Sequence, residues 1–164
     1  IGSTILNIIN RVFEEEYPQE IIFRLTYKVL NQLSSNKEHS KILFIFFLFH
    51  LSKQLGFMPN IDRCNSCNSI FKQDVIFSLR SNSLLCSSCS INNSLDTDFV
   101  LTYESLKNCL LINTTHINNI EDIKISYNHC KELYHFLISF MNSNINHMHK
   151  IKGIKEITKI YHEE

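Results

Sequence analysis

Two cysteine pairs constrain the fold of this chain more than any other feature. Each pair has the form CxxC, with Cys64 and Cys67 in the first, Cys86 and Cys89 in the second, and residues 68–85 between them. This spacing lies within the C-x2-C-x15–20-C-x2-C pattern that is typical of zinc sites. Each CxxC can place two thiolates on one side of a tight turn, and structural zinc takes four ligands in a tetrahedron. We therefore predict that these four cysteines bind a structural Zn²⁺.

The residues between the pairs favour a shared site. Residues 75–79 and 84–85 are predicted to form two short strands around a turn at residues 80–83. A hairpin of this kind would bring the second CxxC back beside the first. The site is also expected to be closed, because a catalytic zinc usually has three protein ligands and one open position for water.

Two disulfides, or four unrelated thiols, are the alternatives to a metal site. No signal peptide is visible in the sequence, which favours a reducing compartment and disfavours disulfides. A redox-active CxxC would normally lie in a thioredoxin-like βαβ pattern, and the sequence shows none. In zinc-finger peptides the metal contributes on the order of 10–16 kcal/mol at pH 7. A short polar segment gains less than this from its own small core.

Apolar residues at helical spacing dominate the rest of the chain. Glycine and proline number only 3 and 2, which argues against a turn-rich all-β fold. The segment 38–55 is apolar almost all round, so we expect it at the centre of a helical domain; it is too short to span a membrane. The acidic residues 14–16 are expected to be solvated, and Pro18 to begin the second helix. Helices are predicted within residues 5–13, 21–33, 38–55, 101–112, 121–141 and 145–162, with polar connections at 34–36, 90–98 and 113–119.

These patterns predict a mainly α fold. A helical bundle-like domain would comprise residues 1–59 and 95–164, and a four-cysteine zinc-finger β-hairpin module would be inserted at residues 60–94. Cys109 is interpreted as core filling, and His50 as a weak candidate ligand because the four cysteines already complete a site. His129 and His135 do not share a helix face, so a site built on them is rejected. No nucleotide-binding or hydrolase motif gives positive evidence for catalysis.

The formal net charge is +0, so any binding to nucleic acid must come from a local patch. The C-terminal segment is the one basic stretch, and a solvated helix face is its alternative interpretation. We predict DNA contacts at Arg63, Arg80, Lys150, Lys152, Lys155 and Lys159.

The motif around the cysteines resembles the bacterial recombination mediator family RecO. It runs Leu55-Gly56-Phe57-x-Pro59-Asn60-Ile61-Asp62-Arg63-Cys64-x2-Cys67 and continues with Phe77-Ser78 and Leu84-Leu85-Cys86-Ser87-Ser88-Cys89. Asn68 and Asn82-Ser83 stand where that family has glycines, and asparagine tolerates the left-handed backbone that such turns need. The four-cysteine arrangement is also similar to the ArfGAP-like zinc finger, which implies no GTPase activity.

The resemblance implies a non-enzymatic role in DNA repair and recombination after DNA damage. Proteins of the family bind single- and double-stranded DNA, anneal complementary strands, and load recombinase with RecR and single-strand-binding protein. The implied location is the bacterial cytoplasm, on the nucleoid. The family's N-terminal OB-fold has no counterpart before Ile5, so we expect this sequence to represent the C-terminal helical domain and zinc finger.

Two other functions remain open at this stage. A zinc-finger adaptor that binds a protein partner without DNA would suit the neutral net charge. A zinc enzyme would need an open coordination position, which four cysteine ligands disfavour.

Overall fold

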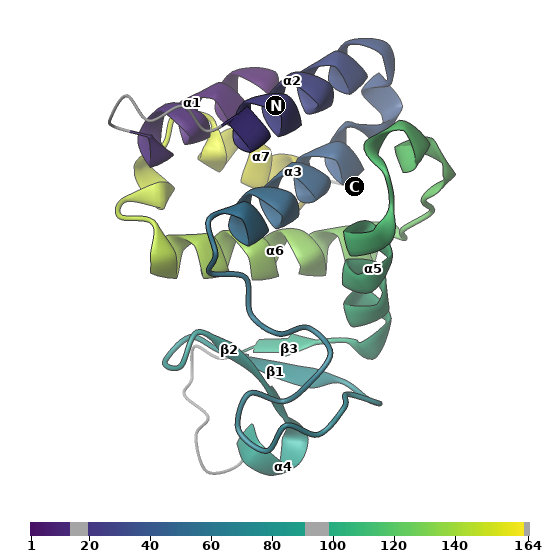
Figure 1. Cartoon of the computed structure of the whole chain (residues 1–164), viewed down its shortest axis with the longest axis vertical. Coiled ribbons are helices and arrows are strands. Elements are labelled where there is room, and N and C mark those ends of the chain that lie inside the picture. The colour runs from purple at the N-terminus through teal and green to yellow at the C-terminus, as the bar shows by residue number, and fades with distance from the viewer. Residues whose placement is uncertain (14–19, 91–98, 163–164) are drawn as a thin grey trace.

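The computed structural model describes residues 1–13, 20–90 and 99–162, which form a helical body above a small sheet (Figure 1). The predicted mainly α fold is confirmed. The elements in chain order are α1 (Gly2–Val12), α2 (Glu20–Ser35), η1 (Lys37–His39), α3 (Ser40–Gln54), β1 (Val75–Ser78), β2 (Ser83–Cys86), α4 (Ser87–Ser90), β3 (Phe99–Leu101), α5 (Tyr103–Thr114), η2 (Ile117–Asp122), α6 (Tyr127–Asn144), η3 (Met148–Lys150) and α7 (Ile154–Ile160).

Helix α3 lies at the centre of the helical body because nearly every one of its faces is apolar. Residues 43–49 are all buried, and α3 contacts α2, α5 and α6. Gly56 ends the helix as predicted, with a φ of 78°. The N–H groups of Gly56 and Phe57 donate to the carbonyls of Lys53 (3.1 Å) and Ser52 (3.3 Å), which is the Schellman arrangement. Within the described part of the chain, no helix combines the length and apolarity needed to cross a bilayer.

Several predicted helix boundaries were wrong, chiefly because hydroxyl caps set the true starts. Helix α5 begins after Thr102, whose side chain accepts from the N–H of Ser105, so Leu101 belongs to a strand. Helix α6 begins after Ser126, whose side chain accepts from the N–H of His129, and residues 117–122 form a separate 3-10 helix. Helix α2 continues to Ser35, and the last segment divides into η3 and α7. The acidic residues 14–16, Pro18 and residues 91–98 lie outside the described residues.

The sheet contains the predicted hairpin and one further strand. β1 pairs antiparallel with β2, with Val75 opposite Cys86, and on its other side antiparallel with β3, with Val75 opposite Leu101. The sheet order is therefore β2-β1-β3. Because β3 belongs to this sheet, we propose that the inserted module extends over residues 60–101 rather than ending at residue 94. We call this segment the cysteine module.

The cysteine module is packed against α6 through an aromatic cluster, and a carboxylate of α6 holds the residues that directly follow the module. The Phe77 ring lies 5.1 Å from that of Phe136 and 6.1 Å from that of Phe140, measured between centroids. The Glu132 Oε2 atom accepts hydrogen bonds from the Thr102 N–H (3.1 Å) and hydroxyl (2.7 Å) and from the Ser105 hydroxyl (2.8 Å). These contacts fix the point where β3 leads into α5, so the module and the body are joined at a defined angle.

Candidate metal centre

The sulfur atoms of Cys64, Cys67, Cys86 and Cys89 converge, and all four lie within 4.8 Å of one another. Those of Cys67 and Cys86 are 3.8 Å apart. A tetrahedron with Zn–S bonds of about 2.3 Å has sulfur atoms about 3.8 Å apart, so the observed spacing suits this ion. Among the described residues, no other group of three or more His, Cys, Asp or Glu side chains could hold a metal. The structure thus brings the four predicted ligands together in one set that could hold a metal ion.

The first cysteine pair lies in a tight turn held by backbone hydrogen bonds. The N–H of Cys64 donates to the carbonyl of Ser69 (2.9 Å), and the N–H of Asn68 donates to the carbonyl of Cys64 (2.9 Å). The N–H of Asn65 donates to the carbonyl of Leu84 (3.0 Å), which ties this turn to β2. The turn is therefore positioned by the same hairpin that carries the second pair.

The second cysteine pair spans the end of a strand and a short helix, where the sequence predicted a tight turn. Cys86 is the last residue of β2, and Cys89 lies in the single turn of α4. The N–H of Cys86 donates to the Sγ atom of Cys64 across the site (3.4 Å). The Gln73 amide donates to the hydroxyl of Ser87 (2.7 Å), which anchors the start of α4.

Hydrogen bonds and mutual proximity give the thiols unequal acidity. The hydroxyl of Ser69 lowers the pKa of Cys67 to about 6. Burial raises the pKa of Cys64, but backbone hydrogen bonds, the first from Cys67, outweigh it and lower the pKa overall. A hydrogen bond from Ser66 lowers the pKa of Cys89, but the neighbouring thiols together raise it to about 12. Four thiolates this close need a cation to balance their charge, and metal binding requires them deprotonated.

Asparagine occupies two left-handed backbone positions in the cysteine module. Asn68 has a φ of 59° and Asn82, in the hairpin turn, a φ of 49°. We predict that the free energy of unfolding of Asn82→Gly lies within about 1 kcal/mol of the wild-type value, because glycine enters this backbone region without strain. Asn82→Val should have a free energy of unfolding about 1–2 kcal/mol lower than that of Asn82→Gly, because a β-branched residue clashes in this backbone region. Urea unfolding of the two zinc-loaded variants measures the difference, and equal stabilities would contradict the assigned turn geometry.

The remaining cysteines and histidines lie outside the sulfur cluster. Cys109 is fully buried, and this burial raises its pKa to about 12, which fits its interpretation as core filling. The Nε2 atom of His50 lies 3.2 Å from the carbonyl oxygen of Ile112, and burial lowers its pKa. His135 contacts His162, with 2.8 Å between their Nε2 atoms. This pair was not predicted, because the two histidines are 27 positions apart and only the fold brings them together.

The residues predicted to contact DNA fall on two separate parts of the molecule. Arg63 and Arg80 lie on the cysteine module, and Arg63 also donates to the carbonyl of Asn68 (3.2 Å), so it supports the first cysteine turn. The four lysines lie on the C-terminal segment of the helical body, where all are exposed.

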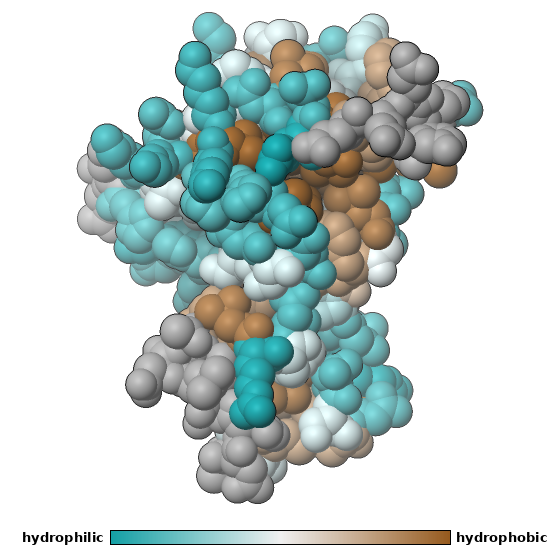
Figure 2. Space-filling view, turned by 90° about the vertical axis from the view of Figure 1, so that its left-hand side faces the viewer, coloured by the Kyte–Doolittle hydropathy of each residue, from teal (hydrophilic) through white to brown (hydrophobic). Residues whose placement is uncertain are grey.

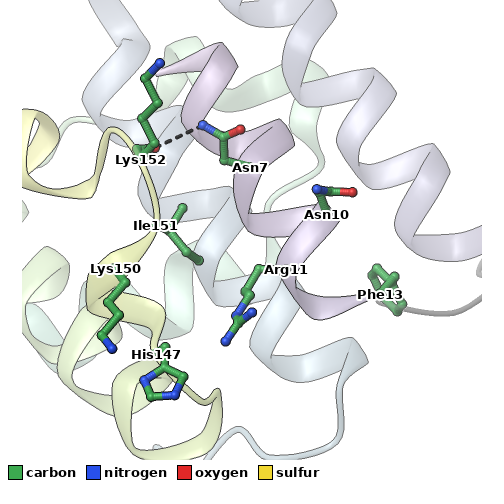
Figure 3. Close-up of a pocket in the computed structure, with 8 residues that line it drawn as sticks. All are labelled: Asn7, Asn10, Arg11, Phe13, His147, Lys150, Ile151 and Lys152. Carbon is green, nitrogen blue, oxygen red and sulfur yellow. Dashed lines mark hydrogen bonds between the residues drawn. The ribbon is translucent and has the colours of Figure 1, made fainter.

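Lys150 and Lys152 line a cavity that also contains Arg11 of α1 (Figure 3). Arg11 was not among the predicted residues, because only the fold brings α1 beside the C-terminal segment. No observation tests whether these residues contact DNA, so that remains a prediction.

Comparison with known proteins adds evidence that is independent of the geometry. The family model described as Recombination protein O C terminal matches residues 1–152. The DNA repair protein RecO of Chlorobium limicola is 38% identical over 60 residues, which cover 37% of this chain and 23% of that protein. The DNA repair protein RecO of Syntrophomonas wolfei is 29% identical over 117 residues, 71% of this chain and 45% of that protein. The chain thus spans less than half the length of these relatives. No solved structure matches it significantly.

Proposed function

We infer a function from family membership: the chain belongs to the recombination protein O (RecO) C-terminal family, which supports a role in DNA repair and recombination. We propose that it is a non-enzymatic mediator domain. Its contributions would be DNA binding, annealing of complementary strands, and recombinase loading together with RecR and single-strand-binding protein, at the bacterial nucleoid. The observation that carries the proposal is the family match over residues 1–152, which includes the whole cysteine module and most of the helical body.

The cysteine module would act as a rigid platform within this function. We propose that Cys64, Cys67, Cys86 and Cys89 hold Zn²⁺, because four thiols form a soft donor set. Bound there, the ion supplies a cross-link between the first turn, the hairpin and α4. Four thiolates complete the tetrahedron, so the site is proposed to serve structure and to perform no chemistry. The platform would display Arg63 and Arg80, which are both exposed, on a surface separate from the C-terminal lysines.

Binding to single-stranded DNA as a function of salt tests the proposal. We expect a fluorescein-labelled oligonucleotide to bind the zinc-loaded chain at low salt. The affinity should fall steeply, with a log–log slope of about −0.7 for each phosphate neutralised. A peptide nucleic acid of the same sequence, which lacks phosphates, is the matched control and should not bind. An anisotropy titration that shows no binding of the oligonucleotide at low salt would exclude a DNA-binding role for this chain.

One observation favours a second candidate, a helical adaptor that binds a protein partner without DNA. Helices α1 and α2 expose large apolar side chains beside a hollow of about 360 Å³. The exposed fractions are 52% for Leu6, 71% for Phe23 and 58% for Tyr27. Figure 2 shows one side of the molecule, where an area of apolar residues adjoins a largely hydrophilic surface on the helical body. Exposed apolar patches of this kind mark protein-binding surfaces. The absence of DNA binding in the titration would favour this candidate.

A further inference from the structure

Two histidines come together on the helical body, apart from the four clustered cysteines. His135 lies in α6 and His162 follows α7, and their Nε2 atoms are 2.8 Å apart. The centroids of the two rings are 4.7 Å apart, and the rings are nearly perpendicular. The two side chains thus turn the same nitrogen atom towards one point.

The distance between these nitrogen atoms is close to that of two ligands on one metal ion. Imidazole nitrogen binds Zn²⁺ at about 2.0–2.1 Å, so two such ligands are about 2.9 Å apart when they meet the ion at a right angle. In a tetrahedron the same ligands are about 3.4 Å apart. From the observed 2.8 Å, a small rotation of either ring reaches the first arrangement. The pair therefore has the geometry of a chelate.

Both histidines are held in place before any ion binds. The neighbour of His162, Tyr161, is fully buried, and its hydroxyl donates to the carbonyl of Lys41 (2.5 Å). The Tyr161 ring stacks on that of Tyr134, with 4.1 Å between their centroids. His135 directly follows Tyr134 in α6, so the stacked tyrosines fix the backbone beside both histidines. A preformed pair of ligands binds an ion at a lower entropic cost.

The protonation of this pair also suits a metal. The two Nε2 atoms cannot both carry a proton at 2.8 Å, because the protons would meet between them. Burial, and then the charges of His162 and Lys131, lower the pKa of His135, which favours its neutral form at pH 7. Without a metal, the spacing fits one N–H···N hydrogen bond between the rings. When an ion binds, the proton of the donating ring moves from Nε2 to Nδ1, so a neutral pair loses no net proton.

The surface beside His135 leaves room for the rest of a coordination shell. A hollow of about 530 Å³ opens there, lined also by Asn128 and Ser139 of α6. Glu132 lines it too, but its Oε2 atom already accepts three hydrogen bonds. We propose that His135 and His162 bind a divalent transition-metal ion that prefers imidazole, such as Zn²⁺, Ni²⁺ or Cu²⁺, with water in the remaining positions. The ion links α6 to the segment after α7.

Titration of the zinc-loaded chain with Ni²⁺ tests the site, because zinc then already fills the cysteine cluster. Calorimetry of the wild type should show one Ni²⁺ bound in addition to the zinc. His135→Gln and His162→Gln should each raise the Kd about a hundredfold, because a single imidazole loses the advantage of chelation. The double variant should bind no more weakly than either single variant. His162 is exposed, so we expect an unchanged circular dichroism spectrum for His162→Gln.

A second histidine pair provides the matched control. The rings of His147 and His149 are 6.2 Å apart between centroids, and both residues are exposed. His147→Asn with His149→Gln removes two imidazoles while keeping a residue that tolerates the left-handed backbone of His147. The Kd for Ni²⁺ should not change in this variant. If it rose here and stayed constant in His162→Gln, the ion would lie at the other pair and the proposal would be overturned.

Two further measurements identify the atoms that bind. A second equivalent of Zn²⁺, which is diamagnetic, should shift the ¹⁵N resonances of the Nε2 atoms of His135 and His162. Lys131→Gln should lower the Kd, because the lysine charge repels a cation at His135. The absence of Ni²⁺ binding beyond the zinc, or unmoved Nε2 resonances, would show that the rings share only a hydrogen bond and would overturn the proposal. None of these outcomes bears on DNA binding.

Discussion

Replacing Cys64 with serine is expected to release the metal and unfold the cysteine module while the helical body remains folded. Cys64 is the most buried of the four clustered cysteines, and its sulfur also accepts the N–H of Cys86. A structural zinc site contributes on the order of 10–16 kcal/mol, and a serine hydroxyl is a poor replacement for a thiolate ligand. Helix α3 contacts α2, α5 and α6, and none of these helices contains one of the four clustered cysteines, so the core of the body does not depend on the site.

Zinc analysis and NMR together measure this effect. Atomic absorption should show near-stoichiometric zinc in the wild type and little in Cys64→Ser. Amide resonances of residues 60–101 should collapse towards unfolded positions, while those of α3 and α6 keep their dispersion. Cys130→Ser is the matched control, since Cys130 is buried outside the cluster and its sulfur lies 3.9 Å from the carbonyl of Ile125. It should retain its zinc. Full zinc content in Cys64→Ser would remove Cys64 from the ligand set.

The features that the sequence predicted correctly are those that short stretches of chain determine. The spacing of the cysteines indicated that four sulfurs would meet, and the structure brings them within 4.8 Å of one another. The apolar run in α3 indicated its central burial, and Gly56 its end. Asn68 and Asn82 were expected to adopt left-handed backbones, and both do. Each of these follows from residues a few positions apart, or from a ligand pattern with known geometry.

The features that sequence analysis missed depend on contacts between distant segments. β3 has only three residues, and the pattern around it resembled the start of a helix. Its place in the sheet comes from pairing with β1, which no local signal encodes. Arg11 likewise comes beside Lys150 and Lys152 only because α1 packs against residues near position 150. Thr102 and Ser126, by contrast, are caps that a closer reading of local sequence would have found.

The β1 strand was predicted, but the role of Phe77 in joining the two parts of the molecule was not. Phe77 is fully buried and contacts rings on both sides of the junction. Its ring lies 5.3 Å from that of Phe99 in β3 and 5.1 Å from that of Phe136 in α6. The same side chain therefore contributes to the core of the sheet and to the interface with the body.

Phe77→Ala should accordingly destabilise the chain by about 3–5 kcal/mol, the usual cost of removing a fully buried phenyl ring. Because the lost contacts lie at the junction, we also expect the cysteine module to move independently of the body. Urea unfolding of the zinc-loaded protein measures the first effect, and NMR relaxation of the module's amides measures the second.

Ile76→Ala is the matched control, because Ile76 is on the same strand but only partly buried. It should cost about 1 kcal/mol and leave the relaxation unchanged. If Phe77→Ala lost stability without any change in module motion, Phe77 would serve only the core of the protein and would not be the contact that holds the module to the helical body.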